Sequence, residues 1–427
     1  MRKPKHDVDL KRLAGIWRDL ITDSPKAAKV LLCETLTPLY GGGVRAGEVD
    51  PELPIRPSSL RGQWRFWWRL LNRVTGKPKE LFSMERDLWG GVGAKDAAAS
   101  KVTVRLVAFS KPDELTPAFE YEKRADGKYR SVPRAMGGVS AYALFPAQGT
   151  VAKGGLSIET EPKKIAKPGL KFELQIDCPD DRWPEVHQAL RWWASFGGVG
   201  ARTRRGLGAV KAVQRGAVGA LKPVTPEEVA EIGGKLILGK RAGDAMEAWR
   251  GAVEQLREFR QGLGIGRQGT DPHTPGRTYW PEADAIRRLS NTHSTGHEPE
   301  HPVSDLYPRA AFGLPIVFHF KDENSKPSDP ARHVLEPDGD FERLASPLIL
   351  RPYWDGQGYR PAALLLPGWE QALRSPLKFK GTGHHGLETW PDDPSRRSVT
   401  ANQIHPMKGQ GDDPLAAFLE FFRKRVR

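Results

Sequence analysis

The segment GLKFELQIDCPDDRWPEVHQALRWWASFGGVGARTRRGLGAV, residues 169–210, decides the fold class. From Leu170 to Cys178 every second residue is apolar and the residues between are charged or polar. This period of two is typical of a half-buried strand. Asp180 or Asp181 then caps a predicted helix over 183–196, with Pro184 in its first turn and Gly197 at its end. A glycine-rich turn leads to a second predicted strand at 208–213, so the segment is strand, helix, turn, strand.

A similar run of elements stands earlier in the chain. Residues 29–35 (KVLLCET) predict a strand, and a glycine loop follows in TPLYGGGVRAG. The next predicted helix covers 60–74 (LRGQWRFWWRLLNRV), with Ser58 or Ser59 as its N-cap. At 100° per residue its tryptophans fall on one arc, which gives the helix a broad apolar face. Residues 101–109 predict another strand.

These elements predict an α+β fold in which two helices cover one face of an antiparallel sheet, a ferredoxin-like (RRM-like) layer. The second half, after a linker near 223–226, carries a helix at 242–259, short strands at 312–320, 345–350 and 362–366, and a helix at 414–425 capped by Asp413. We therefore predict two domains, 1–220 and 221–427. Long loop segments at 264–308 and 380–413 are predicted within the second.

The charge of the chain is unevenly placed. The 427 residues carry a formal net charge of +14, all of it in residues 1–220, whereas residues 221–427 are neutral overall. A basic surface of this size favours a polyanion, either nucleic acid or an anionic membrane. The two cysteines form no CxxC pair, and no apolar run suits a signal peptide or a membrane helix. We expect a globular cytoplasmic protein.

The turn at 198–208, GVGARTRRGLG, has the strongest functional signal. Glycines let backbone N–H groups approach phosphates, and three arginines between them add charged donors. The dinucleotide-binding pattern G-x-G-x-x-G fails because Thr203 stands at its third glycine. The pattern predicts contact with an RNA backbone; the alternative is a solvated hairpin.

The helix at 60–74 adds a second basic feature. Arg61, Arg65 and Arg69 recur every four residues and form a stripe beside the apolar arc. Its tryptophans can stack on bases or pack in the core; core packing is the better interpretation for most of them.

No motif supports catalysis. No Ser-His-Asp order, HExxH string or outstanding carboxylate pair is present, and we predict no catalytic residue, cofactor or metal. His293, His297 and His301 have a spacing that could ligate a metal on a helix. Gly296, Pro299 and Pro302 argue for a loop instead.

Three segments together resemble a known family: TPLYGGG (37–43), SLRGQWRFWWR (59–69) and FGGVGARTRRGLG (196–208). They are similar to the first subunit of the Cmr effector complex of type III-B CRISPR systems, within the RAMP superfamily. The resemblance covers about residues 29–215. It implies two fused (tandem) ferredoxin-like domains with long insertions, in a non-catalytic subunit that binds the CRISPR RNA near its 3′ end. That subunit helps to hold the guide–target duplex at the head of the backbone during antiviral RNA targeting.

The implied partners are CRISPR RNA, single-stranded target RNA and other RAMP subunits, with no membrane. The implied RNA surface consists of Tyr40, Gly41, Gly42, Gly43, Arg61, Trp64, Arg65, Trp68, Arg69, Gly198, Gly200, Arg202, Thr203, Arg204, Arg205, Gly206 and Gly208. The main alternative is a metal-independent RAMP endoribonuclease that processes CRISPR RNA, with His187, His384 or His385 as general base. A free-standing RNA-binding protein is a third possibility.

Overall fold

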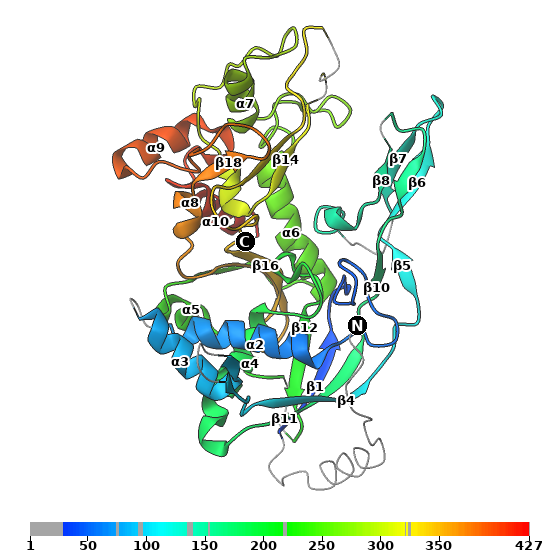
Figure 1. Cartoon of the computed structure of the whole chain (residues 1–427), viewed down its shortest axis with the longest axis vertical. Coiled ribbons are helices and arrows are strands. Elements are labelled where there is room, and N and C mark those ends of the chain that lie inside the picture. The colour runs from blue at the N-terminus through cyan, green and yellow to red at the C-terminus, as the bar shows by residue number, and fades with distance from the viewer. Residues whose placement is uncertain are drawn as a thin grey trace.

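The structure of the protein is a computed structural model. It describes residues 29–73, 77–92, 97–134, 140–152, 154–216, 220–320, 322 and 326–426. A long arm projects from the body on one side, as Figure 1 shows, and the C-terminal half lies above the first sheet.

The first half contains a four-stranded sheet with the order β12-β1-β11-β4, and all its neighbours are antiparallel. Its elements follow the chain as strand, helix, two strands, helix, strand, and this order is the predicted one. They are β1 (Lys29–Thr35), α2 (Pro57–Leu71), β4 (Thr103–Phe109), β11 (Lys171–Asp177), α4 (Trp183–Phe196) and β12 (Val210–Gln214).

The core lies between this sheet and its two helices. Trp64 and Trp68 of α2 and Trp193 of α4 are fully buried there. The rings of Trp64 and Trp193 meet edge to face, with their centroids 5.7 Å apart. Leu174 and Ile176 of β11 are buried beneath them, as the alternation of that strand predicts.

The predicted helix starts are corrected in detail. The N-cap of α2 is Arg56 rather than Ser58 or Ser59, because Pro57 occupies the first helical position. A short 3-10 turn at Asp180–Arg182 precedes α4, so neither Asp180 nor Asp181 caps it with a side chain.

Two insertions extend the first half. The helix α3 (Pro78–Trp89) and the strand pair β2 (Gly91–Val92) and β3 (Ala97–Ala98) follow α2. The projecting arm is made of short antiparallel pairs (Figure 1). Its strands are β5 (Leu115–Pro117), β6 (Phe119–Lys123), β7 (Tyr129–Pro133), β8 (Thr150–Val151), β9 (Ile158–Thr160) and β10 (Lys164–Ala166).

The second half has a three-stranded antiparallel sheet with the order β13-β17-β16. The helices α6 and α10 contact each other and this sheet. The order matches the first three strands of a ferredoxin-like layer, but within the described residues no fourth strand pairs with β13. The elements are α5 (Pro226–Glu231), β13 (Lys235–Leu238), α6 (Ala245–Gln261), β16 (Leu348–Trp354), β17 (Tyr359–Leu365) and α10 (Pro414–Arg425).

A smaller unit sits on the second sheet. It contains the sheet β14-β15-β18 and its own small core around Leu335 and Phe379. The predicted strand at 312–320 is shorter here, because a 3-10 turn occupies Pro308–Phe312. The elements of this unit are α7 (Glu282–Ser290), β14 (Ile316–Phe318), β15 (His333–Pro337) and β18 (Leu377–Phe379). The helices α8 (Gln371–Arg374) and α9 (Pro394–Gln403) contribute Leu373 and Ala401 to the core shared with α6 and α10.

Two buried arginines join the halves, each reaching from one half into the other. Arg205 donates to the carbonyl oxygens of Leu348, at 3.0 Å, and Phe312, at 3.1 Å. Arg351 of β16 donates in return to the carbonyls of Gly197, at 2.6 Å, and Ala194, at 3.0 Å. The carbonyls at the end of α4 have no partner within the helix, so Arg351 caps it. One hydrophobic core also contains residues from both sides of position 220, and the division into two domains stays a prediction.

Candidate nucleic-acid interface

The two glycine loops predicted from the sequence lie against each other. The backbone N–H of Ala201 donates to the carbonyl of Tyr40 at 2.7 Å. A Cβ atom on Gly200, whose φ is +75°, would stand 2.6 Å from that same carbonyl oxygen, and one on Gly42 would stand 3.1 Å from the Cα of Gly200. These glycines therefore serve the close approach of two chain segments.

Tyr40 is buried in this contact. Its hydroxyl donates to the carbonyl of Pro146 at 3.1 Å, and burial raises its pKa. Gly41 and Gly43 are closed in as well, since a Cβ on either would meet Ala201 or the carbonyl of Glu48 within 3 Å. The loop 40–43 supports the turn from behind.

The three arginines of the turn have different environments. Arg205 is 8% exposed and makes hydrogen bonds to four groups, including Ser346 Oγ at 3.3 Å. Burial lowers its pKa to about 9, and only neutral oxygens hold the guanidinium in place. The side chain of Arg205 is thus used inside the fold, and its contact with RNA stays a prediction.

Arg202 lies on the other side of the turn, in a left-handed backbone conformation with φ of +62°. Its Nε donates to the carbonyl of Ala143 at 3.3 Å. Arg260 of α6 reaches the same region and donates to the hydroxyl of Tyr142 at 3.0 Å, while its Nε is buried without a partner. Burial lowers the pKa of Arg202, and the positive charge of Arg260 lowers it further.

Arg204 is the third arginine of the turn. It is partly buried, and its guanidinium donates to the carbonyl of Ser346 and lies 5.9 Å from the centre of the Phe66 ring. Burial lowers its pKa. Across the part of the chain that the structure describes, no carboxylate forms an ion pair with Arg202, Arg204, Arg205 or Arg260.

A carboxylate of the neighbouring helix α3 partly neutralises the predicted arginine stripe of α2. Arg65 donates to Glu85 of α3, with Nη2 2.6 Å from Oε1, and Arg69 Nη1 lies 3.7 Å from Oε2 of the same residue. Glu85 is buried beneath the pair. Arg61 has no partner among the described residues. Two arginines of the stripe therefore share the Glu85 carboxylate, and the third, Arg61, has no ion-pair partner in the described chain.

Trp64 and Trp68, which were predicted to belong to the RNA surface, lie in the core of this structure, and their contact with RNA stays a prediction. Both are fully buried, and Trp68 Nε1 donates to Glu185 at 2.7 Å. A ring enclosed by other side chains has no face on which a base can stack. Thr203 and the backbone of Gly198, Gly206 and Gly208 form the turn itself.

A cleft of about 280 Å³ opens between α2 and the turn, with Ile349 of β16 on its floor. One wall is the face of α2 that carries Gly62 and Phe66; the other contains Arg204. None of the lining residues is acidic. The lining consists of Ser59, Gly62, Gln63, Phe66, Trp67, Phe196, Gly197, Thr203, Arg204 and Ile349.

Three polar side chains of the cleft have hydrogen-bonding groups that no described residue satisfies. Ser59, Gln63 and Thr203 make no side-chain hydrogen bond to any residue that the structure describes. Sequence patterns did not single out Ser59, Gln63 or Arg260 as site residues. Ser59 and Gln63 are four residues apart on α2, the same spacing that marked the arginine stripe, and could have been found by it. Arg260 is close in sequence to the glutamates of α6, and only the folded structure shows that its guanidinium is not paired with one of them.

The histidines considered for catalysis lie outside this cleft. His187 is on α4 with its ring 5.6 Å from that of Trp183, and burial lowers its pKa. The Nδ1 of His385 lies 3.2 Å from a carboxylate oxygen of Asp338, and the backbone N–H of His384 donates to Thr382. No described histidine lines the cleft.

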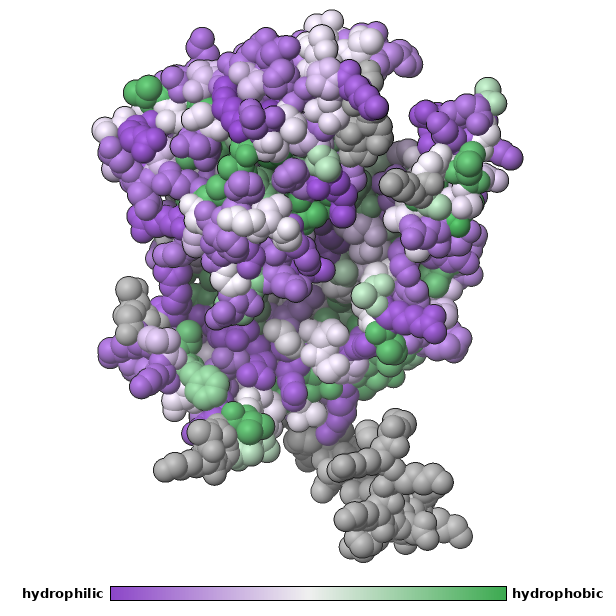
Figure 2. Space-filling view, turned by 45° about the horizontal axis from the view of Figure 1, so that its top comes forward, coloured by the Kyte–Doolittle hydropathy of each residue, from purple (hydrophilic) through white to green (hydrophobic). Residues whose placement is uncertain are grey.

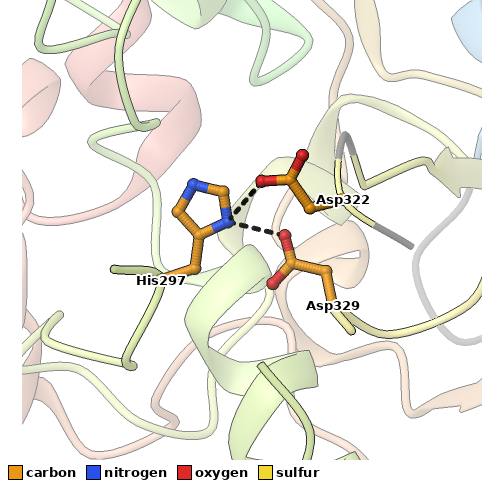
Figure 3. Close-up of side chains that lie close together, drawn as sticks. All are labelled: His297, Asp322 and Asp329. Atoms are coloured by element: carbon orange, nitrogen blue, oxygen red, sulfur yellow. Dashed lines mark hydrogen bonds and ion pairs between the residues drawn. The ribbon is translucent and has the colours of Figure 1, made fainter. Parts of the chain in front are cut away.

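One histidine belongs to an acidic cluster in the C-terminal half. Figure 3 shows the carboxylates of Asp322 and Asp329 both facing the Nδ1 of His297, which lies 2.7 Å from an Asp329 oxygen. Asp329 also accepts two hydrogen bonds from Arg287. Burial would raise the pKa of Asp329, but Arg287 and His297 keep it below its usual value. Because this carboxylate is already balanced, we interpret the cluster as an ion-pair network, and the segment around His297 is a loop as predicted.

Comparison with known protein families gives a match over most of the first half. The family model described as the RAMP superfamily matches residues 32–211. The matched RAMP region contains the sheet β12-β1-β11-β4 up to Lys211, both of its helices and the glycine turn. At the level of the RAMP superfamily, this match confirms the resemblance predicted from the sequence for residues 32–211.

Comparison with solved structures also gives matches. A crystal structure of Cmr1 from Pyrococcus furiosus is 16% identical, with a TM-score of 0.38, and the match covers 82% of this chain and 98% of that one. A chain from the type III-B Cmr-beta complex bound to cognate target RNA and AMPPnP, in the presence of ssDNA, is 12% identical, with a TM-score of 0.39 and coverages of 94% and 99%. A chain of a type IV-B CRISPR complex is 14% identical, with a TM-score of 0.26 and coverages of 48% and 99%. No curated protein matches the chain.

Proposed function

We propose that this RAMP protein is a non-catalytic RNA-binding subunit of a type III-B CRISPR effector complex. In this proposal it holds the CRISPR RNA near its 3′ end and the guide–target duplex, beside other RAMP subunits in the cytoplasm. The residues that resemble the first Cmr subunit, TPLYGGG, RFWWR and ARTRRG, support this choice within the superfamily. None of the described helices is both long enough and apolar enough to cross a membrane.

One observation carries the RNA-binding part of the proposal. The turn and its surroundings gather Arg202, Arg204 and Arg260, and none of them is paired with a carboxylate of the described chain. Like charges held together in a partly buried place repel one another unless an anion joins them. A phosphodiester backbone supplies that anion at regular intervals.

The RNA strand then follows the turn on two sides. Arg204 and the free polar groups of the cleft lie on the α2 side, and Arg202 and Arg260 lie on the α6 side. Contacts of this kind position a strand without reading its sequence. This suits a subunit that must accept many different guides. Figure 2 shows hydrophilic residues over most of one face of the molecule, with hydrophobic residues in small separate patches.

The test compares charge removal at the turn with the same change elsewhere. The test variant is Arg202→Gln with Arg260→Gln, and the control is Arg423→Gln with Lys424→Gln, which removes two cations paired with Glu420 on α10. We expect the double variant to bind single-stranded RNA at least about tenfold more weakly, as loss of about 1.5–3 kcal/mol per charged hydrogen bond implies. The control should bind as the unaltered protein does. Equal losses in both would refute the assignment.

Membership of the complex and absence of catalysis have their own tests. The tagged chain should co-purify with other RAMP subunits and a short guide RNA; recovery without them would favour a free-standing RNA-binding protein. Incubation with repeat RNA in EDTA should leave the RNA intact. Single-site cleavage that disappears in a His187, His384 or His385 variant would establish the endoribonuclease instead.

A further inference from the structure

The cleft between α2 and the turn differs from the backbone contacts described above. Its floor is apolar, with Trp67, Phe196 and Ile349 each at most 3% exposed. Its rim is polar and not acidic. An apolar floor offers a phosphate no hydrogen bond or opposite charge, whereas a nucleobase has a flat apolar face and a polar edge.

The polar rim is arranged for the edge of a planar group. Ser59, Gln63 and Phe66 are spaced by four and three residues and therefore share one face of α2. The Gln63 amide offers one acceptor and one pair of donors, and it is unengaged among the described residues. Such an amide can pair with a base edge that has a donor next to an acceptor.

The opposite wall offers a flat surface. The guanidinium of Arg204 lies over Phe66 and is fixed by its bond to the carbonyl of Ser346. Bases that leave a stack are commonly held against aromatic rings or guanidinium planes.

Gly62 supplies the most specific observation. It lies in the interior of α2 and is exposed, and a Cβ atom built on it meets nothing within 4 Å. Glycine is among the least favourable residues in a helix interior, and nothing in the described chain occupies the space that a side chain would take. A ligand that passes close to the helix backbone explains a glycine at this position.

The size of the cleft limits what enters it. Its volume of about 280 Å³ lies just below the range of typical ligand sites, about 300–1,000 Å³. One nucleotide fits this space; a duplex or a run of stacked bases does not.

We propose that the cleft binds a single unstacked nucleotide of the RNA strand, which passes over Gly62 and places its base between Gln63 and Arg204. This inference rests on the proposed RNA-binding function and adds a site for one base to it. Since every base has an edge that an amide can meet, the site selects an unstacked base rather than a sequence.

The experiment uses the full chain and a series of single-stranded RNAs, each with 2-aminopurine at one position and a dye at one end. Anisotropy of the dye reports binding, and 2-aminopurine fluorescence rises when that base leaves the stack. Gly62→Phe fills the cleft from open space, and Gln63→Leu removes the amide without changing the charge. Gly62→Ala is the matched control, because a methyl group there leaves the cleft open.

We expect a severalfold rise in fluorescence at one RNA position with the unaltered protein and with Gly62→Ala. The rise should disappear in Gly62→Phe and Gln63→Leu, while anisotropy still reports binding. RNA that binds with no rise at any position, or with a rise that Gly62→Phe leaves unchanged, overturns this inference and spares the proposed function. Absence of RNA binding by the unaltered chain overturns both. Circular dichroism of each variant confirms that the fold is kept.

Discussion

At the scale of single residues, neighbouring arginines of one turn differ in burial and in the groups they bind. Arg205 holds the two halves together through neutral oxygens, whereas Arg202 and Arg204 remain partly accessible. The sequence presents the three as equivalent cations between glycines. Only the position of β16 behind the turn separates them, and a pattern within eleven residues contains no information about a strand 140 residues later.

Arg205→Ala should destabilise the protein rather than simply weaken RNA binding. It leaves several buried oxygens without donors, at about 1–3 kcal/mol each, so we expect a loss of at least about 3 kcal/mol in the free energy of unfolding. Lysine should not restore it, because the guanidinium meets its acceptors in a planar fork. Urea titration with Arg202→Gln as the comparison measures this. A loss below about 1 kcal/mol, together with lost RNA binding, would return Arg205 to the RNA surface.

The network around Asp329 predicts a response to acid. The folded pKa of Asp329 lies below its unfolded value, so its contribution to stability is present above about pH 4 and is lost as the pH falls through the folded pKa. Asp329→Asn should be destabilised at neutral pH by about 3–5 kcal/mol, because it leaves Arg287 buried with one partner fewer. Below pH 4 the difference from the unaltered protein should shrink. Urea unfolding at several pH values decides; a constant difference would show that this carboxylate is not the group concerned.

At the scale of elements, the alternation of β11 and the apolar arcs of α2 and α4 were sufficient to predict the first layer. Each buries one face, and that face can be read from neighbouring residues. The shielding of Arg65 and Arg69 by Glu85 was not readable, because α3 reaches them only through the folded path of the chain. Trp64 and Trp68 were assigned to RNA by resemblance, although their period already placed them in the core.

The docking of the two glycine loops predicts a specific sensitivity. Gly200→Ala has to hold a left-handed conformation and also pushes a methyl group against the Tyr40 carbonyl and Leu39, whereas Gly127→Ala in the arm has nearly the same φ and open space. We expect a loss of about 1–3 kcal/mol more for Gly200→Ala than for Gly127→Ala. Thermal unfolding of both variants measures the difference. Equal losses would mean that the loops do not depend on their close contact.

At the scale of the whole molecule, the first half carries the net positive charge, the second half is neutral overall, and the two halves share a core. Arg205 and Arg351 cross between them in opposite directions, and the α4 carbonyls depend on the second half for their donor. The neutral half therefore helps to shape the glycine-rich turn, and it contributes Arg260 to the proposed RNA surface. Composition showed the division of charge but not this dependence.

This interlocking predicts one cooperative transition. A fragment that ends at residue 220 should expose the carbonyls of Ala194 and Gly197 and part of the shared core, and should lack a cooperative unfolding transition of its own. Calorimetry of the full chain should show a single transition. Two separate transitions, one of them reproduced by the fragment, would establish independent halves.

The salt dependence of RNA binding tests the central claim most directly. Each phosphate contact on a single strand contributes about 0.7 to the slope of log K against log salt, so removal of both Arg202 and Arg260 should lower that slope by about 1.4. The control, Arg423→Gln with Lys424→Gln, should leave the slope unchanged. An unaltered slope in the double variant, with the fold intact, would contradict the claim that these side chains grip the RNA backbone.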